Sequence, residues 1–240
     1  MSSANKSWSS FHSWAIYTQQ DDSFSLPVSN ILQIAATTQP HYQLQRPVTS
    51  HLTTIIQLKY ANFARYGTIL AHEITHSLDT KNIRTDSLGN LIINNTWSEE
   101  LLMEYNKRVQ CLVDQYGSYD IEGKKVDSNE TKGENIADNG GLRHAYFAYK
   151  AYLKKYDNEH KDILEDFEMY TPDQMFFISY ATMWCDSQTS GELKLSMNFD
   201  VHSPKKFRII GPVSNMKEFS EAFKCGNDKP MNPVNKCILW

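Results

Sequence analysis

The feature that most constrains this chain is the run His72-Glu73-Ile74-Thr75-His76, which lies in a segment with helical apolar spacing. On a helix, residues four apart stand one above the other, with their Cβ atoms about 5–6 Å apart. Two imidazoles at that spacing can bind one Zn²⁺, while the glutamate beside the first one can hold a water at the metal. Ionisable side chains in a buried helix are costly unless something binds them. The pattern therefore favours a metal site over two core histidines satisfied by hydrogen bonds. The apolar residues that predict burial are Tyr66, Ile69, Leu70 and Ile74.

A second motif, Gly133-Glu134-Asn135-Ile136-Ala137-Asp138, opens the next strongly helical segment. Glu134 and Asp138 are four apart and share a helix face, so one can bind the metal while the other accepts a hydrogen bond from a ligand imidazole. Two histidines and one acidic residue, with a fourth position left open, form the ligand set of a catalytic zinc site. A closed structural zinc site would need four protein ligands.

Composition narrows the class of protein. The 240 residues are 40% hydrophobic and carry a net charge of −4, which fits a globular chain without the basic surface that nucleic acids require. No apolar run is long enough to cross a bilayer, and no apolar stretch of the kind found in signal peptides follows Met1. The cysteines show no C-x-x-C pair that would predict a second zinc site. Glycosylation sequons begin at Asn5, Asn94 and Asn129 and are compatible with a secreted context.

Patterning predicts one mainly helical unit with a small β element near the N-terminus. Short strands are expected at 14–17 and 24–27, and a charged loop at 118–132. Gly140-Gly141, unfavourable inside a helix, indicates a close approach to another helix or to the site. Helices are expected at about 52–79, at 97–116 with Gly117 ending it, at 134–155, from a Thr171-Pro172 start, and from Asn215 as N-cap.

Between the last two of these regions lies Asp200-Val201-His202-Ser203-Pro204, followed by Arg208. A loop histidine beside a proline is usually a surface residue. Next to a zinc site, however, His202 becomes a candidate donor to an oxyanion.

In motif order and content the chain resembles the C-terminal catalytic region of the neprilysin and endothelin-converting enzyme family of zinc metallopeptidases. The resemblance runs from about residue 13 to 240. The matching stretches are His72-Glu73-Ile74-Thr75-His76, Gly133-Glu134-Asn135-Ile136-Ala137-Asp138-Asn139-Gly140-Gly141-Leu142, Asp200-Val201-His202-Ser203-Pro204, Phe207-Arg208-Ile209-Ile210-Gly211, and Met231-Asn232-Pro233 before Cys237 and Trp240.

The resemblance implies a thermolysin-like (gluzincin) fold and a role for each matching residue. His72, His76 and Glu134 would bind the zinc, and Asp79 and Asp138 would hold the two histidines. Glu73 would be the catalytic carboxylate and His202 would stabilise the tetrahedral intermediate. Arg208 would bind substrate carbonyls, and Ala15 would lie in the strand that pairs with the peptide. Trp14 stands where the family has Asn in that strand, Ser77 replaces a Gly, and Ile238 replaces an Arg.

Length departs from the family pattern, whereas the four cysteines match it. Family members are about three times longer, with a membrane anchor and an N-terminal helical region that closes over the cleft. The resemblance pairs Cys111 with Cys237 and places the partners of Cys185 and Cys225 in that N-terminal region. We therefore expect a fragment, a partial gene model or a shortened paralogue. Residues 1–12 would form an unstructured segment and 13–240 the peptidase domain.

The resulting hypothesis is a zinc-dependent endopeptidase that binds one Zn²⁺ per chain and acts on oligopeptides, with Glu73 as general base. Its expected partners are the peptide and the missing N-terminal half or a full-length paralogue. Nucleic acid and direct membrane insertion are not expected. The resemblance implies an extracellular or cell-surface location. The alternative is a catalytically weak or inactive relative that binds peptides or a partner. A purely structural zinc protein is disfavoured because three ligands leave one coordination position open.

Overall fold

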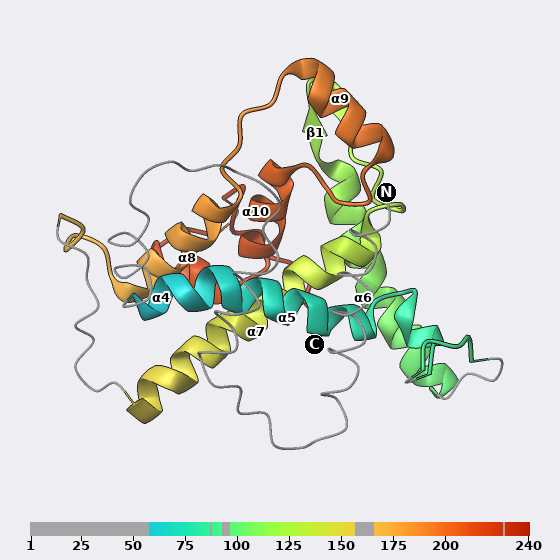
Figure 1. Ribbon diagram of the computed structural model, residues 1–240, viewed down its shortest axis with the longest axis horizontal. Coiled ribbons are helices and arrows are strands. Elements are labelled where there is room, and N and C mark those ends of the chain that lie inside the picture. Colours follow the sequence, from blue (N-terminus) through green and yellow to red (C-terminus); the bar gives the residue numbers. More distant parts are fainter. Residues whose placement is uncertain (1–57, 87, 93–96, 157–165, 228) are drawn as a thin grey trace, which may run out of the picture. The chain divides into compact units, whose positions relative to one another are not determined.

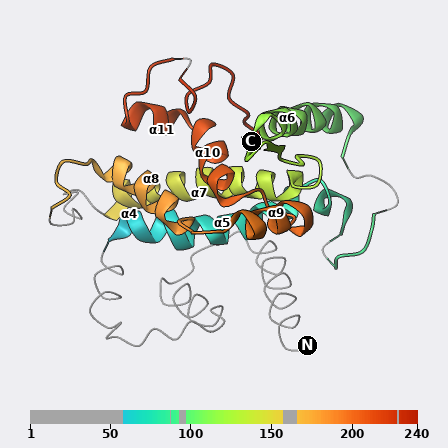
Figure 2. The same cartoon turned by 90° about the horizontal axis from the view of Figure 1, so that it is seen from above.

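A central helix, α7 (Lys132–Tyr156), carries the second motif and organises the fold. The computed structural model describes residues 58–240 except 87, 93–96, 157–165 and 228, and these lie in one compact unit, Leu58–Trp240. Figure 1 shows α7 crossing behind the helix that carries the first motif. Figure 2 shows it lying between that helix and the helices α10 (Lys205–Ser214) and α11 (Lys217–Ala222). The expectation of a mainly helical unit is confirmed for the described residues.

The first motif lies on a nearly continuous helical run. This run comprises α4 (Lys59–Asn62), a π-helical stretch at Phe63–Gly67, α5 (Thr68–Thr75) and a 3₁₀ turn at His76–Leu78. A further 3₁₀ turn follows at Asn82–Arg84. The predicted start at residue 52 lies outside the described residues, as do the two strands expected at 14–17 and 24–27. π-Helical segments often occur near functional sites, and this one directly precedes the motif helix.

Helices α5 and α7 approach closely because two glycines lie at their contact. A Cβ atom on Gly140 would lie 2.5 Å from Thr75 Cγ2, and one on Gly141 would lie 2.9 Å from the backbone nitrogen of His72. The close approach predicted for this glycine pair is therefore confirmed. It places the helical run that carries both histidines against the helix that carries Glu134.

We expect Gly141→Ala to lower the free energy of unfolding by about 1–3 kcal/mol, because the new methyl group meets backbone that cannot turn aside. Denaturant unfolding would measure the loss. The matched control is Gly191→Ala in an exposed helix, where the nearest atom to a new Cβ is 3.9 Å away. Equal stability of the two variants would contradict the tight contact.

Two predictions made for residues 97–132 need correction. Helix α6 (Glu99–Ser118) continues through Gly117, which was expected to end it. Its backbone does not take the left-handed conformation of a terminating glycine. Instead, a Cβ there would lie 2.9 Å from Ser128 Oγ, so the glycine serves packing. The expected loop at 118–132 contains an antiparallel hairpin, β1 (Asp120–Ile121) and β2 (Lys124–Lys125), turned at Gly123 with a positive φ of 77°.

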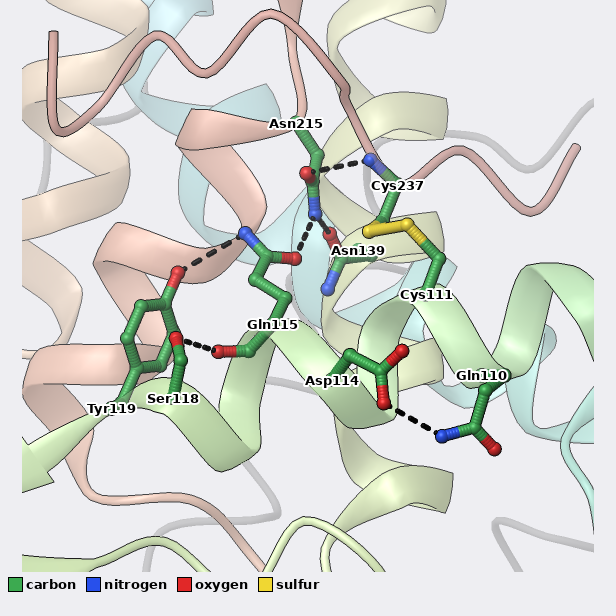
Figure 3. Close-up of a disulfide and its surroundings, with 9 residues drawn as sticks. All are labelled: Gln110, Cys111, Asp114, Gln115, Ser118, Tyr119, Asn139, Asn215 and Cys237. Carbon is green, nitrogen blue, oxygen red and sulfur yellow. Dashed lines mark hydrogen bonds between the residues drawn. A yellow bond between two sulfur atoms is a disulfide. The ribbon is translucent and has the colours of Figure 1, made fainter. Parts of the chain in front are cut away.

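The C-terminal part contains α8 (Pro172–Met183), α9 (Ser190–Phe199), α10 (Lys205–Ser214) and α11 (Lys217–Ala222). The capping box predicted at the start of α8 is confirmed, with Thr171 and Gln174 bonding reciprocally. Asn215 was wrongly predicted to cap the last helix, since Met216 holds that position. The Asn215 side chain instead donates to Gln115 Oε1 and Asn139 Oδ1 and accepts from the Cys237 amide (Figure 3).

Two apolar clusters hold the helices together. One joins α4, α7, α8 and α11, with Tyr149, Phe176 and Tyr180 almost fully buried. The other joins α6, the start of α7, α10 and the C-terminal tail, with Tyr116 fully buried. Among the described residues, none of the helices is long and apolar enough to cross a membrane.

A disulfide between Cys111 and Cys237 ties the irregular tail to α6, and the Cα atoms lie 5.5 Å apart (Figure 3). This is the pairing that the resemblance implied, and Cys185 and Cys225 are free thiols. Closing a loop of 126 residues removes chain entropy from the unfolded state worth roughly 5 kcal/mol. The bridge therefore compensates for a tail in which the described residues after α11 form no helix and no extended strand.

Candidate active site

Three side-chain atoms converge where α5 meets the first turn of α7. His72 Nε2 lies 3.0 Å from His76 Nε2. Glu134 Oε2 lies 3.2 Å from the first nitrogen and 3.4 Å from the second. Donors bound at 2.0–2.1 Å to a tetrahedral Zn²⁺ are about 3.3 Å from one another. The triangle formed by these atoms therefore has the size of one face of a zinc coordination tetrahedron, and these residues fit the metal.

Carboxylates behind the histidines fix the orientation and the tautomer of each ring. His72 Nδ1 lies 2.9 Å from Asp138 Oδ1, and His76 Nδ1 lies 2.9 Å from Asp79 Oδ2. Because an ionised carboxylate can only accept, each Nδ1 carries the hydrogen in the neutral ring. The lone pair is then on Nε2 and points toward Glu134.

Asp79 is itself held by the turn that follows the motif. Its Oδ1 accepts hydrogen bonds from the backbone amides of Lys81 and Asn82 at 2.8 and 2.7 Å. Asn82 also donates through Nδ2 to the carbonyl oxygen of His76. The local sequence after the second histidine thus folds back to support it.

The acidic groups dominate the electrostatics of the pair. Burial alone lowers the pKa of His76, but hydrogen bonds with Asp79 and Glu134 outweigh it and raise the pKa to about 10. The pKa of His72 is also raised, because Asp138 and Glu134 outweigh its desolvation. Desolvation raises the pKa of Glu134, but the three histidines that face its carboxylate outweigh it and hold the pKa far below its usual value. Surroundings that favour a proton here also favour a metal cation, which must displace that proton.

Asp138 joins the metal-site histidine to Arg208. Asp138 Oδ1 faces His72 Nδ1. The two oxygens of this carboxylate also accept hydrogen bonds from Nε and Nη2 of Arg208, at 2.8 and 2.7 Å. The guanidinium also stacks on Trp184, 3.9 Å from the ring centroid. Arg208 is therefore fixed at the edge of the site, with its remaining N–H groups free of Asp138. No local sequence pattern points to this contact between Arg208 and Trp184.

His202 reaches the same carboxylate from the loop between α9 and α10. Its Nε2 lies 3.0 Å from Glu134 Oε2, and its Nδ1 lies 2.7 Å from Asp200 Oδ1. Burial lowers the pKa of His202, but Glu134 outweighs it and raises the pKa, which favours the charged, donating ring. Asp200 was not predicted to act in the site. Its position two residues before the histidine, where Oδ1 also accepts the His202 amide, was the available signal.

The remaining predicted site residues have different outcomes. Glu73 follows His72 directly on α5 and is half-buried. Ala15 lies outside the described residues. The structure thus brings together seven of the predicted side chains around one point: His72, His76, Glu134, Asp79, Asp138, His202 and Arg208.

Comparison with solved structures gives the same fold. A structure described as a Haemonchus galactose containing glycoprotein complex matches with a TM-score of 0.71 and 32% identity over 86% of this chain and 32% of that one. The Mycobacterium tuberculosis zinc metalloprotease Zmp1 in complex with inhibitor matches with a TM-score of 0.68 and 28% identity, over 85% and 30%. The expectation of a thermolysin-like (gluzincin) zinc peptidase domain is confirmed by these neighbours.

Sequence comparison points to the same family. The chain is 41% identical over 182 residues to an endothelin-converting enzyme homolog of Locusta migratoria, covering 76% of this chain and 24% of that protein. It is 36% identical over 230 residues to neprilysin-3 of Drosophila melanogaster, covering 95% and 27%. The chain thus spans about a quarter of the length of these curated relatives. Residues 41–239 match the model of peptidase family M13, and the chain belongs to that family.

Proposed function

We propose that this chain is the catalytic part of a zinc-dependent endopeptidase that hydrolyses oligopeptides. The observation that supports it most is the triangle of His72 Nε2, His76 Nε2 and Glu134 Oε2, with edges of 3.0–3.4 Å, beside the glutamate of the H-E-x-x-H motif. Family membership supports the same reaction class. The described residues contain one such triangle, which supports one Zn²⁺ per chain.

When bound, Zn²⁺ acts as a Lewis acid that polarises a carbonyl and makes water nucleophilic near neutral pH. Glu73 would accept a proton from that water and deliver it to the leaving amine nitrogen. His202, held by Asp200, would donate a hydrogen bond to the carbonyl oxygen as negative charge develops on it. Arg208, fixed by Asp138 and Trp184, would orient the peptide through a backbone carbonyl.

The setting of this reaction is also a proposal. An extracellular or cell-surface location is supported by the Cys111–Cys237 bridge, since disulfides persist in oxidising compartments. Cys185 is exposed and unpaired within the described residues. We propose that a partner, such as an N-terminal half or a full-length paralogue, supplies further family sequence. This partner would bury the Cys185 thiol.

The test measures metal and cleavage together. Purified chain should contain one zinc per molecule and cleave a fluorogenic oligopeptide. A chelator should remove both zinc and cleavage, and added zinc should restore them. Absence of stoichiometric zinc in a folded sample would overturn the proposal.

A different outcome separates the alternative function. The chain spans about a quarter of the length of its relatives, which supports a second candidate function, that of a non-catalytic protein that binds peptides. Such a protein would keep zinc and fold yet show no cleavage. Peptide binding without turnover in the zinc-loaded wild type would support that second function.

A further inference from the structure

We infer that Ser203 is a positioning residue that sets the place of His202 over the metal site. This inference rests on the proposed function, because it concerns the group that would stabilise charge on the substrate oxygen. Ser203 follows His202 directly and precedes Pro204, from which α10 begins. It is 3% exposed, whereas Val201 in the same loop is 46% exposed.

A chain of buried hydrogen bonds connects this serine to the ligand helix. Ser203 Oγ donates to Asn135 Oδ1 at 2.7 Å. Asn135 Nδ2 donates to Thr131 Oγ1 at 3.0 Å, and Thr131 Oγ1 donates to the Asp127 carbonyl oxygen at 3.0 Å. Asn135 is 1% exposed and Thr131 is 5% exposed, so water does not compete for these bonds.

This chain of hydrogen bonds runs beside the contact between His202 and Glu134. Ser203 and Asn135 are the immediate neighbours of His202 and Glu134, whose Nε2 and Oε2 atoms lie 3.0 Å apart. Two adjacent residues of the loop thus meet two adjacent residues of α7. His202 and Glu134 lie at the metal site, and the hydrogen bond between Ser203 and Asn135 beside them fixes the distance between them.

Asp200 cannot do this alone. It hydrogen-bonds His202 through both the ring and the amide, but it belongs to the same loop and moves with it. It therefore sets the direction of the ring within the loop. Ser203 sets the distance of the loop from α7, because its hydroxyl bonds a side chain on the other element.

Loss of this hydroxyl should affect catalysis through His202 and leave the metal in place. Ser203→Ala leaves Asn135 Oδ1 buried without its donor, which a relaxed loop would relieve by shifting. Misplacing a hydrogen-bond donor by a fraction of an ångström weakens its stabilisation of the transition state more than its interaction with the ground state. The expected signature is a lower kcat with an unchanged KM and full zinc.

The experiment uses two probes of the zinc-loaded chain. A peptide phosphonate carries a tetrahedral oxyanion that His202 would bind, whereas a small hydroxamate binds the metal and reports only on it. Ser203→Ala should weaken phosphonate binding about tenfold, the value of roughly one hydrogen bond, and leave hydroxamate binding unchanged. kcat for a cleaved peptide should fall by the same factor.

Matched variants separate positioning from general loss of stability. Ser220→Ala removes another buried serine hydroxyl that donates to an asparagine Oδ1, at 2.8 Å, in α11, and should leave both probes unchanged. Thr131→Ser keeps the hydroxyl of the chain and should behave as wild type. Thr131→Val keeps the shape and loses the hydroxyl, so it should follow Ser203→Ala.

The decisive comparison is made in a His202→Ala background. If Ser203 acts through His202, Ser203→Ala should cost nothing further there. An additional tenfold loss in that background, or no loss in the single variant, would overturn the inference. A wild type that binds neither probe would instead overturn the proposed function, and the inference with it.

Discussion

Glu73→Gln is expected to lower kcat for peptide cleavage by about 10²–10⁴-fold, the usual contribution of a general base. Glutamine has nearly the same shape and can still hydrogen-bond a water, but it cannot accept the proton. Glu73 lies on α5 beside His72 and is not one of the three converging donors. Zinc content should therefore remain at one per chain. Metal analysis and steady-state kinetics on the same preparation measure both quantities.

The matched control is Glu130→Gln, which changes an exposed glutamate shortly before α7. It should cleave as wild type does. If Glu73→Gln retained wild-type kcat with full zinc, the assignment of the general base would be wrong. If it lost zinc as well, Glu73 would be acting as part of the metal site.

Glu134→Ala is expected to lower zinc affinity by more than the roughly 10–100-fold that loss of a supporting residue behind a metal ligand costs. The change removes the anionic donor and leaves two neutral imidazoles, which hold zinc weakly. Cleavage should disappear with the metal and return only partly at high zinc. Competition with a chelating indicator measures the affinity, and Glu130→Ala is the control at an exposed position in the same region. Unchanged zinc binding in Glu134→Ala would mean that the metal lies elsewhere.

The candidate site could be predicted from the sequence where its residues lie on regular helices. The four-residue spacings of His72 with His76 and of Glu134 with Asp138 translate directly into shared faces. Gly140-Gly141 indicated a close contact, and the structure shows this contact to be with α5. His202 was a candidate oxyanion donor from its place in the sequence, and the family resemblance added its role and the disulfide pairing.

The parts that were missed depend on tertiary contacts. Helix α10 contains Gly211 and Pro212, which normally break helices. A Cβ on Gly211 would lie 2.1 Å from Tyr116 Oη, so packing against α6 requires the glycine. Pro212 cannot donate to the carbonyl oxygen of Arg208, and the Tyr180 hydroxyl donates to it instead. Neither partner is near in sequence, so the local Gly-Pro pair argued against a helix that tertiary contacts stabilise.

Other misses had a local signal or a competing partner. Helix α9 starts with a capping box between Thr189 and Glu192, a pattern that is readable in the sequence. Asn215 has the residue type of a helix cap, but its side chain forms three hydrogen bonds to residues of α6, α7 and the tail. These distant donors and acceptors outcompete the local one.

The glycine contact between α5 and α7 limits how this site can move. With backbone against backbone at Gly141, neither helix can rotate or slide without a steric clash, since packed interiors deform little. We therefore expect the two halves of the metal triangle to move together as one block. Any opening that admits a peptide or releases its products must therefore occur at boundaries other than the contact between α5 and α7. Such an opening would change access to the metal but not the distances between the atoms that bind it.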